Sequence, residues 1–296
     1  MDYRLLLLMH LPLGLELQAE DCRYLFAPEL NPEARDQVTA ALVSPTARLY
    51  LKHKQHWVET SYKTLKQGEH HGIRWSYLGK PDYPKAWEGL SFRPLVFSFQ
   101  GTPIWLTTPL LSVVGSRTPS TSTLLWMQRE LSEFLKRRDV GVVSGGARGV
   151  DQWAHKMAME SKRPTVCILP SGLLNPYPFE HEHLWKQILD LGGCMLSTCA
   201  LDEPIRKSFF HVRNRWIAGL SSMCFVAEAN RRSGSLLTAR LALEEHKTLC
   251  TLPVFPTAEQ GLGNLDLIND GGFLLRDHRD LLSLWDQSAL LSPAAP

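Results

Sequence analysis

A glycine-rich turn between two apolar segments is the feature of this sequence with the clearest chemical potential. The β-branched run 140–143 leads into Ser144, Gly145 and Gly146, and an amphipathic helical pattern follows from Val150. A strand that enters such a turn ahead of a helix directs backbone N–H groups and the positive end of the helix dipole toward one point. The turn is therefore predicted to bind a phosphate group.

The same arrangement occurs about 30 residues earlier, the size of one strand–helix–strand unit. There the apolar run 110–114 ends in Gly115, Ser116 and Arg117, and apolar residues follow at helical spacing up to Leu135. Two consecutive units of this kind predict a parallel sheet with both turns at its carboxyl edge. Arg117 adds a positive charge to that edge.

Positive charge is concentrated in residues 204–240. This segment holds seven lysine and arginine residues against one acidic residue, whereas the whole chain of 296 residues carries a net charge of only +2. Within it, cations alternate with aromatic side chains over residues 207–216. Cations contact phosphates and aromatic rings stack on unpaired bases, so the segment predicts a surface for single-stranded nucleic acid. A helix is expected over residues 213–220, which would place Arg213 and Arg215 in its first turn. Cations oppose the helix dipole there unless an anion lies nearby.

Two nucleotide-binding motifs are missing from these turns. A Walker A loop needs a lysine that residues 115–122 lack. A dinucleotide fingerprint needs GxGxxG and an acidic residue after the next strand, but residues 145–149 read GGxxG and residues 169–172 contain no acid. The sequence therefore disfavours a P-loop enzyme and an NAD or FAD enzyme.

A hydrolase triad of Ser144, Asp151 and His155 is also disfavoured, because all three come from one turn and helix without a GxSxG elbow. Asp151 and His155 lie four residues apart on one helical face. We predict that they form a hydrogen-bonded pair that braces the turn. No catalytic residue is expected.

Metal, disulfide and membrane sites are not expected either. The six cysteines form no CxxC pair, and Cys167, Cys224 and Cys250 lie inside apolar runs, which indicates buried, reduced thiols. His181 and His183 are predicted to be solvated loop residues rather than ligands. The apolar run 5–8 is followed by His10, Pro12 and Glu16, which favours an apolar helix of the mature protein over a signal peptide. No run is long enough to span a membrane. We expect a cytoplasmic protein without a metal or cofactor.

The chain divides into three parts. Residues 1–70 are predicted to form a small helical domain, residues 73–285 an extended Rossmann-like domain, and residues 286–296 a tail. The predicted class is α/β, a doubly wound and mostly parallel sheet, because apolar strand segments alternate with amphipathic helices. The strands are expected at residues 73–78, 95–99, 110–114, 140–143, 165–169, 195–197, 223–227, 248–252 and 273–275.

An ordered set of motifs resembles the DNA-processing protein A (DprA, or Smf) family of bacteria. The matching elements are Tyr83 and Pro84, residues 113–117, residues 144–151 with Ala154 and His155, Tyr177 and Pro178, residues 210–215 with 217–220, Glu228 and Ala229, residues 233–239, and Leu267 and Ile268 with Gly271. His211 stands where the family usually has proline, Thr198 where it has glutamate, and Val254 where it has glycine.

The resemblance implies a non-enzymatic recombination mediator. Such proteins have a SAM-like N-terminal domain, form homodimers, protect incoming single-stranded DNA and help to load the RecA recombinase in natural transformation. The winged-helix domain that many members append is not expected in the residues up to 296. In the family, the Gly-Ser-Arg arginine and the basic residues near the Phe-x-x-Arg-Asn-Arg element contact the DNA backbone, and glycine-rich and Ser-Gly-Ser elements donate backbone N–H groups. The residues assigned to DNA on this basis are Gly115, Ser116, Arg117, Ser144, Gly145, Gly146, Lys207, Phe210, Arg213, Asn214, Arg215, Ser233, Gly234 and Ser235.

One alternative shares this type of fold. Phosphoribohydrolases that act on nucleoside monophosphates carry a Pro-Gly-Gly-x-Gly-Thr-x-x-Glu element, and residues 232–244 contain no Pro-Gly-Gly. Similarity of fold alone does not establish function. A nucleotide-binding enzyme or sensor of the phosphoribohydrolase-like Rossmann type therefore remains the second hypothesis.

Overall fold

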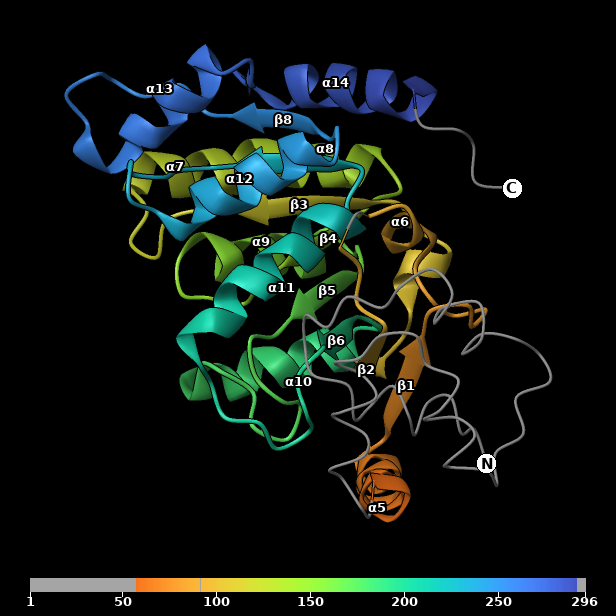
Figure 1. The fold of residues 1–296 in the computed structure, drawn as a ribbon. Coiled ribbons are helices and arrows are strands. Elements are labelled where there is room, and N and C mark those ends of the chain that lie inside the picture. The colour runs from red at the N-terminus through yellow and green to blue at the C-terminus, as the bar shows by residue number, and fades with distance from the viewer. Residues whose placement is uncertain (1–56, 91, 292–296) are drawn as a thin grey trace.

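The computed structural model describes residues 57–90 and 92–291, and within them the strands form one nine-stranded sheet in the order β1-β2-β6-β5-β4-β3-β7-β8-β9 (Figure 1). β1 is antiparallel to β2 and β2 to β6, whereas all other neighbours are parallel. The strands are β1 (Ile73–Tyr77), β2 (Val96–Gly101), β3 (Leu110–Val114), β4 (Gly141–Ser144), β5 (Thr165–Ile168), β6 (Cys194–Ser197), β7 (Met223–Val226), β8 (Thr248–Thr251) and β9 (Phe273–Leu274).

Helices cover both faces of the sheet, because the parallel strands are apolar on both sides. Val143 and Ile168 point to one face, and their neighbours Val142 and Cys167 point to the other. The first face carries α6 (Lys85–Glu88), α11 (Lys207–Leu220), α12 (Gly234–Glu244) and α13 (Leu262–Asn269). The second face carries α5 (Trp57–His70), α7 (Thr121–Trp126), α8 (Ser132–Arg137), α9 (Val150–Glu160), α10 (Glu182–Asp190) and α14 (His278–Leu291). The sheet is therefore doubly wound, as predicted.

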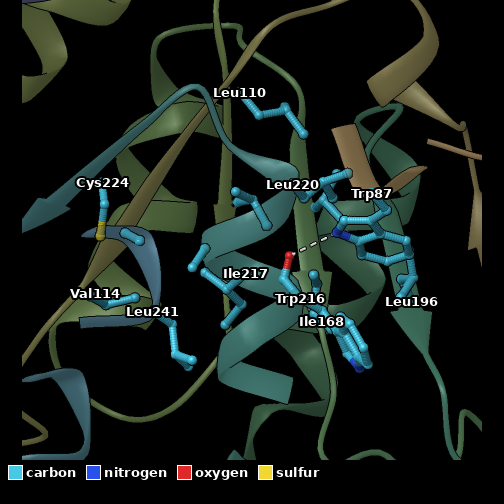
Figure 2. Close-up of a cluster of buried hydrophobic side chains, with 14 of the residues drawn as sticks. Trp87, Leu110, Val114, Ile168, Leu196, Trp216, Ile217, Leu220, Cys224 and Leu241 are labelled. Carbon is cyan, nitrogen blue, oxygen red and sulfur yellow. Dashed lines mark hydrogen bonds between the residues drawn. The ribbon is translucent and has the colours of Figure 1, made fainter. Parts of the chain in front are cut away.

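The core beneath α11 fixes the position of this helix on the sheet (Figure 2). Trp87 of α6 and Trp216 of α11 are both buried, and the Trp87 Nε1 donates to the Trp216 carbonyl at 3.2 Å. Ile217 and Leu220 of the same helix pack in this cluster. A buried indole needs a partner for its N–H group, so this hydrogen bond ties α11 to the segment before β2.

The strand predictions are confirmed, with ends that shift by one or two residues. The predicted start of α11 at Arg213 is wrong, because the helix begins at Lys207. Its first turns carry exposed Lys207 and His211 beside half-buried aromatic residues, so they lack the apolar stripe on which the prediction relied. Arg213 therefore lies in the middle of the helix, and the helix-dipole reasoning does not apply to it.

One other boundary differs from the expectation. α14 continues into the predicted tail as far as Leu291. Most of the predicted helical domain, residues 1–56, lies outside the described residues, so this domain stays a prediction. No helix in the described part of the chain is long and apolar enough to cross a membrane.

Candidate nucleic-acid interface

The turns that follow β3 and β4 meet at the carboxyl edge of the sheet, as predicted. The Val150 N–H at the start of α9 donates to the Ser116 carbonyl at 3.0 Å. Gly149 lies beside that carbonyl with a φ of +79°, and a Cβ there would overlap the Ser116 oxygen. The Ser235 hydroxyl donates to the Gly115 carbonyl at 2.8 Å. These contacts join the turn after β3 to the turn after β4 and to the start of α12.

A cavity of about 330 Å³ opens at this edge. The turns after β3 and β4, the segment after β5 and the helix α11 line it. The lining residues are Arg117, Thr118, Gly145, Ala147, Arg148, Pro170, Tyr177, Pro178, Glu180, Phe210 and Arg213. Four of the predicted DNA-binding residues, namely Arg117, Gly145, Phe210 and Arg213, therefore border one cavity.

Phe210 contacts both predicted arginines. The guanidinium carbons of Arg117 and Arg213 lie 5.6 and 5.7 Å from the centroid of its ring. The Tyr177 ring packs against it edge to face, with 6.2 Å between the centroids. Cation–π contacts of this length stabilise a guanidinium without neutralising its charge. Phe210 therefore holds two positive charges beside the cavity.

Arg213 is an unusual cation because its side chain is only 7% exposed. Its guanidinium covers Gly145, where a Cβ would overlap it. It pairs loosely with the Asp151 carboxylate, with 3.9 Å between Nη1 and Oδ2, and its Nε is buried without a hydrogen-bond partner in the described part of the chain. A buried charge is costly unless it is paired and hydrogen-bonded. The cavity wall therefore presents an incompletely satisfied cation, which an anion would complete.

Asp151 faces the same turn from the first turn of α9. Burial raises the pKa of Asp151, against the opposing effects of Arg213 and of the backbone N–H groups of Ala147 and Gly145. Burial likewise lowers the pKa of Arg213, with Asp151 opposing. Both shifts follow from lost hydration, which a pair separated by 3.9 Å offsets only in part. A guanidinium stays protonated at neutral pH all the same, so the cavity keeps its charge.

The predicted hydrogen bond between Asp151 and His155 is absent from the structure. His155 Nδ1 lies 2.7 Å from the Thr165 hydroxyl, which itself donates to the Val142 carbonyl, so His155 is the donor of this pair. The His155 imidazole therefore points toward β5, which begins at Thr165, and not toward Asp151. The Ser144 hydroxyl donates to the Val113 carbonyl at 2.7 Å, between two strands. Neither Ser144 nor His155 is among the residues that line the cavity.

The prediction that His181 is a solvated loop residue is wrong. His181 is buried, its Nδ1 lies 3.0 Å from the Gly146 carbonyl, and its ring packs on Trp185. His183, two residues further on, is exposed as predicted, but it lies in the first turn of α10 and not in a loop. The fold of the segment after β5 brings His181 back under the glycine-rich turn. Local polarity alone does not reveal this contact.

The same segment supplies cavity residues that the sequence analysis did not assign. Tyr177, Pro178 and Glu180 line the cavity, and Glu180 accepts from the Arg148 Nε at 2.7 Å. The Tyr177–Pro178 motif is the one sequence signal for this segment. It marks the segment as shared with a family without showing where it lies in space.

Several predicted residues lie outside the cavity. Asn214 donates to the Gly234 carbonyl at 3.3 Å, and Ser233 caps α12 by accepting from the Ser235 N–H at 3.2 Å. Lys207 is exposed at the start of α11, and Arg215 packs over Phe92 on another side of that helix. The thiols Cys167, Cys194, Cys199, Cys224 and Cys250 are free and buried, which confirms the prediction for the described cysteines.

His155 is expected to make the stability of the fold pH-dependent. Burial, together with the charges of His181 and Arg213, lowers its pKa to about 3. Below a pH of about 6.5 the unfolded chain therefore binds a proton that the folded chain rejects, which costs about 1.4 kcal/mol of stability per pH unit. Urea unfolding at pH 7.5, 6.0 and 5.0 should show this slope, and His155→Gln should flatten it while lowering stability at pH 7.5. An unchanged slope in His155→Gln would assign the pH dependence to other groups.

Known proteins match this chain in sequence. The family described as DNA recombination-mediator protein A matches residues 74–286. Protein Smf of Escherichia coli (strain K12) is 35% identical over 244 residues, which are 80% of this chain and 62% of the Escherichia coli protein. The chain thus spans about three fifths of the length of that relative.

Two solved structures share the fold. DNA processing protein A from Streptococcus pneumoniae is 24% identical, with a TM-score of 0.79 over 96% of this chain and 97% of that one. DNA processing protein A from Helicobacter pylori, described for its single-stranded DNA binding mode, is 27% identical, with a TM-score of 0.63 over 72% of this chain and 96% of that one. The first comparison confirms the predicted architecture.

Proposed function

Because the chain belongs to the DNA recombination-mediator protein A family, we propose that it binds single-stranded DNA and acts as a recombination mediator. The observation that carries this proposal is the buried, incompletely paired guanidinium of Arg213 at a cavity that Arg117 also lines. A phosphate in the cavity would be a charge partner for both arginines, because both line it. The single-stranded DNA binding described for the Helicobacter pylori relative supports the same ligand.

The position of the cations favours a single strand over a duplex. Arg213 lies within the wall of the cavity, so a phosphate reaches it only if the strand bends into the recess. A duplex is stiff over about 50 nm and keeps its phosphates on a regular surface, whereas a single strand bends freely. The two arginines contact the backbone rather than the base edges, so we expect little sequence preference.

We assign no catalytic step to this cavity. Ser144 and His155 are engaged between strands and behind the turn, away from the cavity lining. Homodimer formation, protection of incoming single strands and loading of RecA are proposed on the family resemblance. Light scattering of the purified protein, followed by strand-exchange assays with RecA, would test these steps.

The first test is fluorescence anisotropy of labelled oligo(dT) and a matched duplex at several salt concentrations. Arg117→Ala should weaken binding of the single strand roughly tenfold, because a hydrogen-bonded phosphate contact is lost, and should reduce the salt slope by about 0.7. Lys136→Ala is the matched control, because Lys136 is an exposed cation of α8 on the opposite face of the sheet.

Two outcomes would contradict the proposal. An Arg117→Ala variant with the affinity and salt slope of Lys136→Ala would remove Arg117 from the site. Tight binding of thymidine monophosphate without binding of oligo(dT) would favour the nucleotide-binding alternative.

A further inference from the structure

An exposed ion pair joins two of the segments that line the cavity. The Arg148 Nε donates to Glu180 Oε1 at 2.7 Å, and Arg148 Nη2 contacts the same oxygen. Arg148 belongs to the turn before α9, and Glu180 belongs to the segment between β5 and α10. Both side chains are exposed, whereas the Arg213 side chain is buried. The Arg148–Glu180 pair is therefore on the side of the cavity that solvent and ligands reach.

Glu180 places a negative charge in a cavity whose other charged lining residues are Arg117, Arg148 and Arg213. The backbone N–H of Glu180 and the Arg148 guanidinium lower the pKa of the Glu180 carboxyl, so it is ionised at neutral pH. The carboxylate repels a phosphate in the cavity, and it also engages N–H donors of Arg148 that suit a phosphate oxygen. Glu180 thus opposes the ligand that the three arginines favour.

The two segments are held together by buried contacts that do not involve this ion pair. His181, the residue after Glu180, is buried, and its Nδ1 lies 3.0 Å from the Gly146 carbonyl. The Trp185 ring packs on His181 and lies so close to Gly146 that a Cβ there would overlap it. An ion pair between exposed side chains adds little to the stability of a fold. Arg148 can therefore exchange its partner without loosening the turn.

We propose that Glu180 is an intramolecular competitor of the strand: it holds Arg148 in the free protein and releases this arginine to a backbone phosphate when single-stranded DNA binds. A carboxylate and a phosphodiester each carry one negative charge, so the exchange leaves Arg148 neutralised in both states. The affinity for DNA is lowered by the free energy of the ion pair that has to break. This inference rests on the proposed binding of single-stranded DNA, and it identifies a residue that limits the affinity.

Glu180→Gln should therefore tighten the binding of labelled dT20, measured by fluorescence anisotropy, about threefold. The amide keeps the size of the side chain but removes its charge, and the gain corresponds to the strength of an exposed ion pair. Glu182→Gln is the matched control, because Glu182 is an exposed acid in the first turn of α10 that is not among the lining residues. It changes the net charge equally and should leave the affinity close to that of the wild type.

The exchange of partners has its own signature in the salt dependence. Arg148→Ala should reduce the salt slope of dT20 binding by about 0.7, because one phosphate contact is lost. The reduction should be the same in the wild type and in Glu180→Gln, because Arg148 contacts a phosphate in both complexes. Thermal unfolding should give midpoints close to that of the wild type for all of these variants, because the substituted side chains are exposed.

The outcomes separate this inference from the proposed function. Equal affinities of Glu180→Gln and Glu182→Gln would show that Glu180 does not compete with the strand, and the inference would be wrong. An unchanged salt slope in Arg148→Ala would also overturn it, because Arg148 would then not be transferred to a phosphate, even if Glu180→Gln binds more tightly through reduced repulsion alone. If the wild type does not bind dT20, the proposed function itself fails.

Discussion

Replacing Arg213 by alanine should abolish measurable binding of oligo(dT) and destabilise the fold by about 3–5 kcal/mol. The loss of binding follows because Arg213 is the buried cation of the cavity wall. The loss of stability follows because Asp151 would be left buried without a positive partner. Anisotropy and urea unfolding of the same preparation measure the two effects separately.

A double variant distinguishes these effects. Arg213→Met combined with Asp151→Asn removes both charges, so it should recover much of the stability while binding stays lost. The destabilisation of Arg213→Ala should also shrink toward acidic pH. Burial already raises the pKa of Asp151, and without Arg213 the folded state would favour the protonated carboxyl still more. Retained binding in the double variant would show that Arg213 does not contact DNA.

Gly145→Ala should remove most of the DNA binding while leaving the protein folded. A methyl group there would overlap the Arg213 guanidinium, which can move into the adjoining cavity at the expense of its position. Because Arg213 would then lose its place in the cavity wall, we expect a loss of affinity of at least tenfold by anisotropy, equivalent to about 1.4 kcal/mol.

Two other glycine positions provide the controls. Gly146 has a φ of +68°, and a Cβ there would meet Trp185 and the Cys167 sulfur, so Gly146→Ala should lower the thermal stability instead. A Cβ at Gly89 would meet nothing within 4 Å in the described part of the chain, and its φ of −83° suits alanine, so Gly89→Ala should change neither property. Similar affinities of Gly145→Ala and Gly89→Ala would contradict the role of the Gly145 surface.

Local sequence patterns predict the strands of this fold and the turns and helices that follow them. The β-branched run before Ser144 and the helical spacing after Val150 predict a strand, a turn and a helix, and the structure contains all three. The repeat of this unit after β3 predicts that Arg117 and Gly145 meet at one edge. These predictions succeed because periodicity and turn chemistry depend on neighbours in the chain.

Local sequence patterns do not predict the burial or the contacts of a residue whose partners are distant in the sequence. Composition marks Arg213 as basic but does not show that it is buried over Gly145, 68 positions earlier in the chain. The polar neighbours of His181 predict a solvated side chain, yet it contacts the Gly146 carbonyl. The predicted start of α11 is misplaced because Phe210, in the first turns of this helix, contacts Tyr177 and Arg117 of two loops and adds no apolar stripe to the pattern.

The sequence by itself determined the α/β class, the turns suited to phosphate, the basic segment and the family resemblance. The tertiary structure decided which of the basic side chains share a cavity, which is buried, and which lies on Phe92. The physical reason is that the charge of an arginine is a property of the residue, whereas its desolvation and its pairing are properties of the surrounding fold.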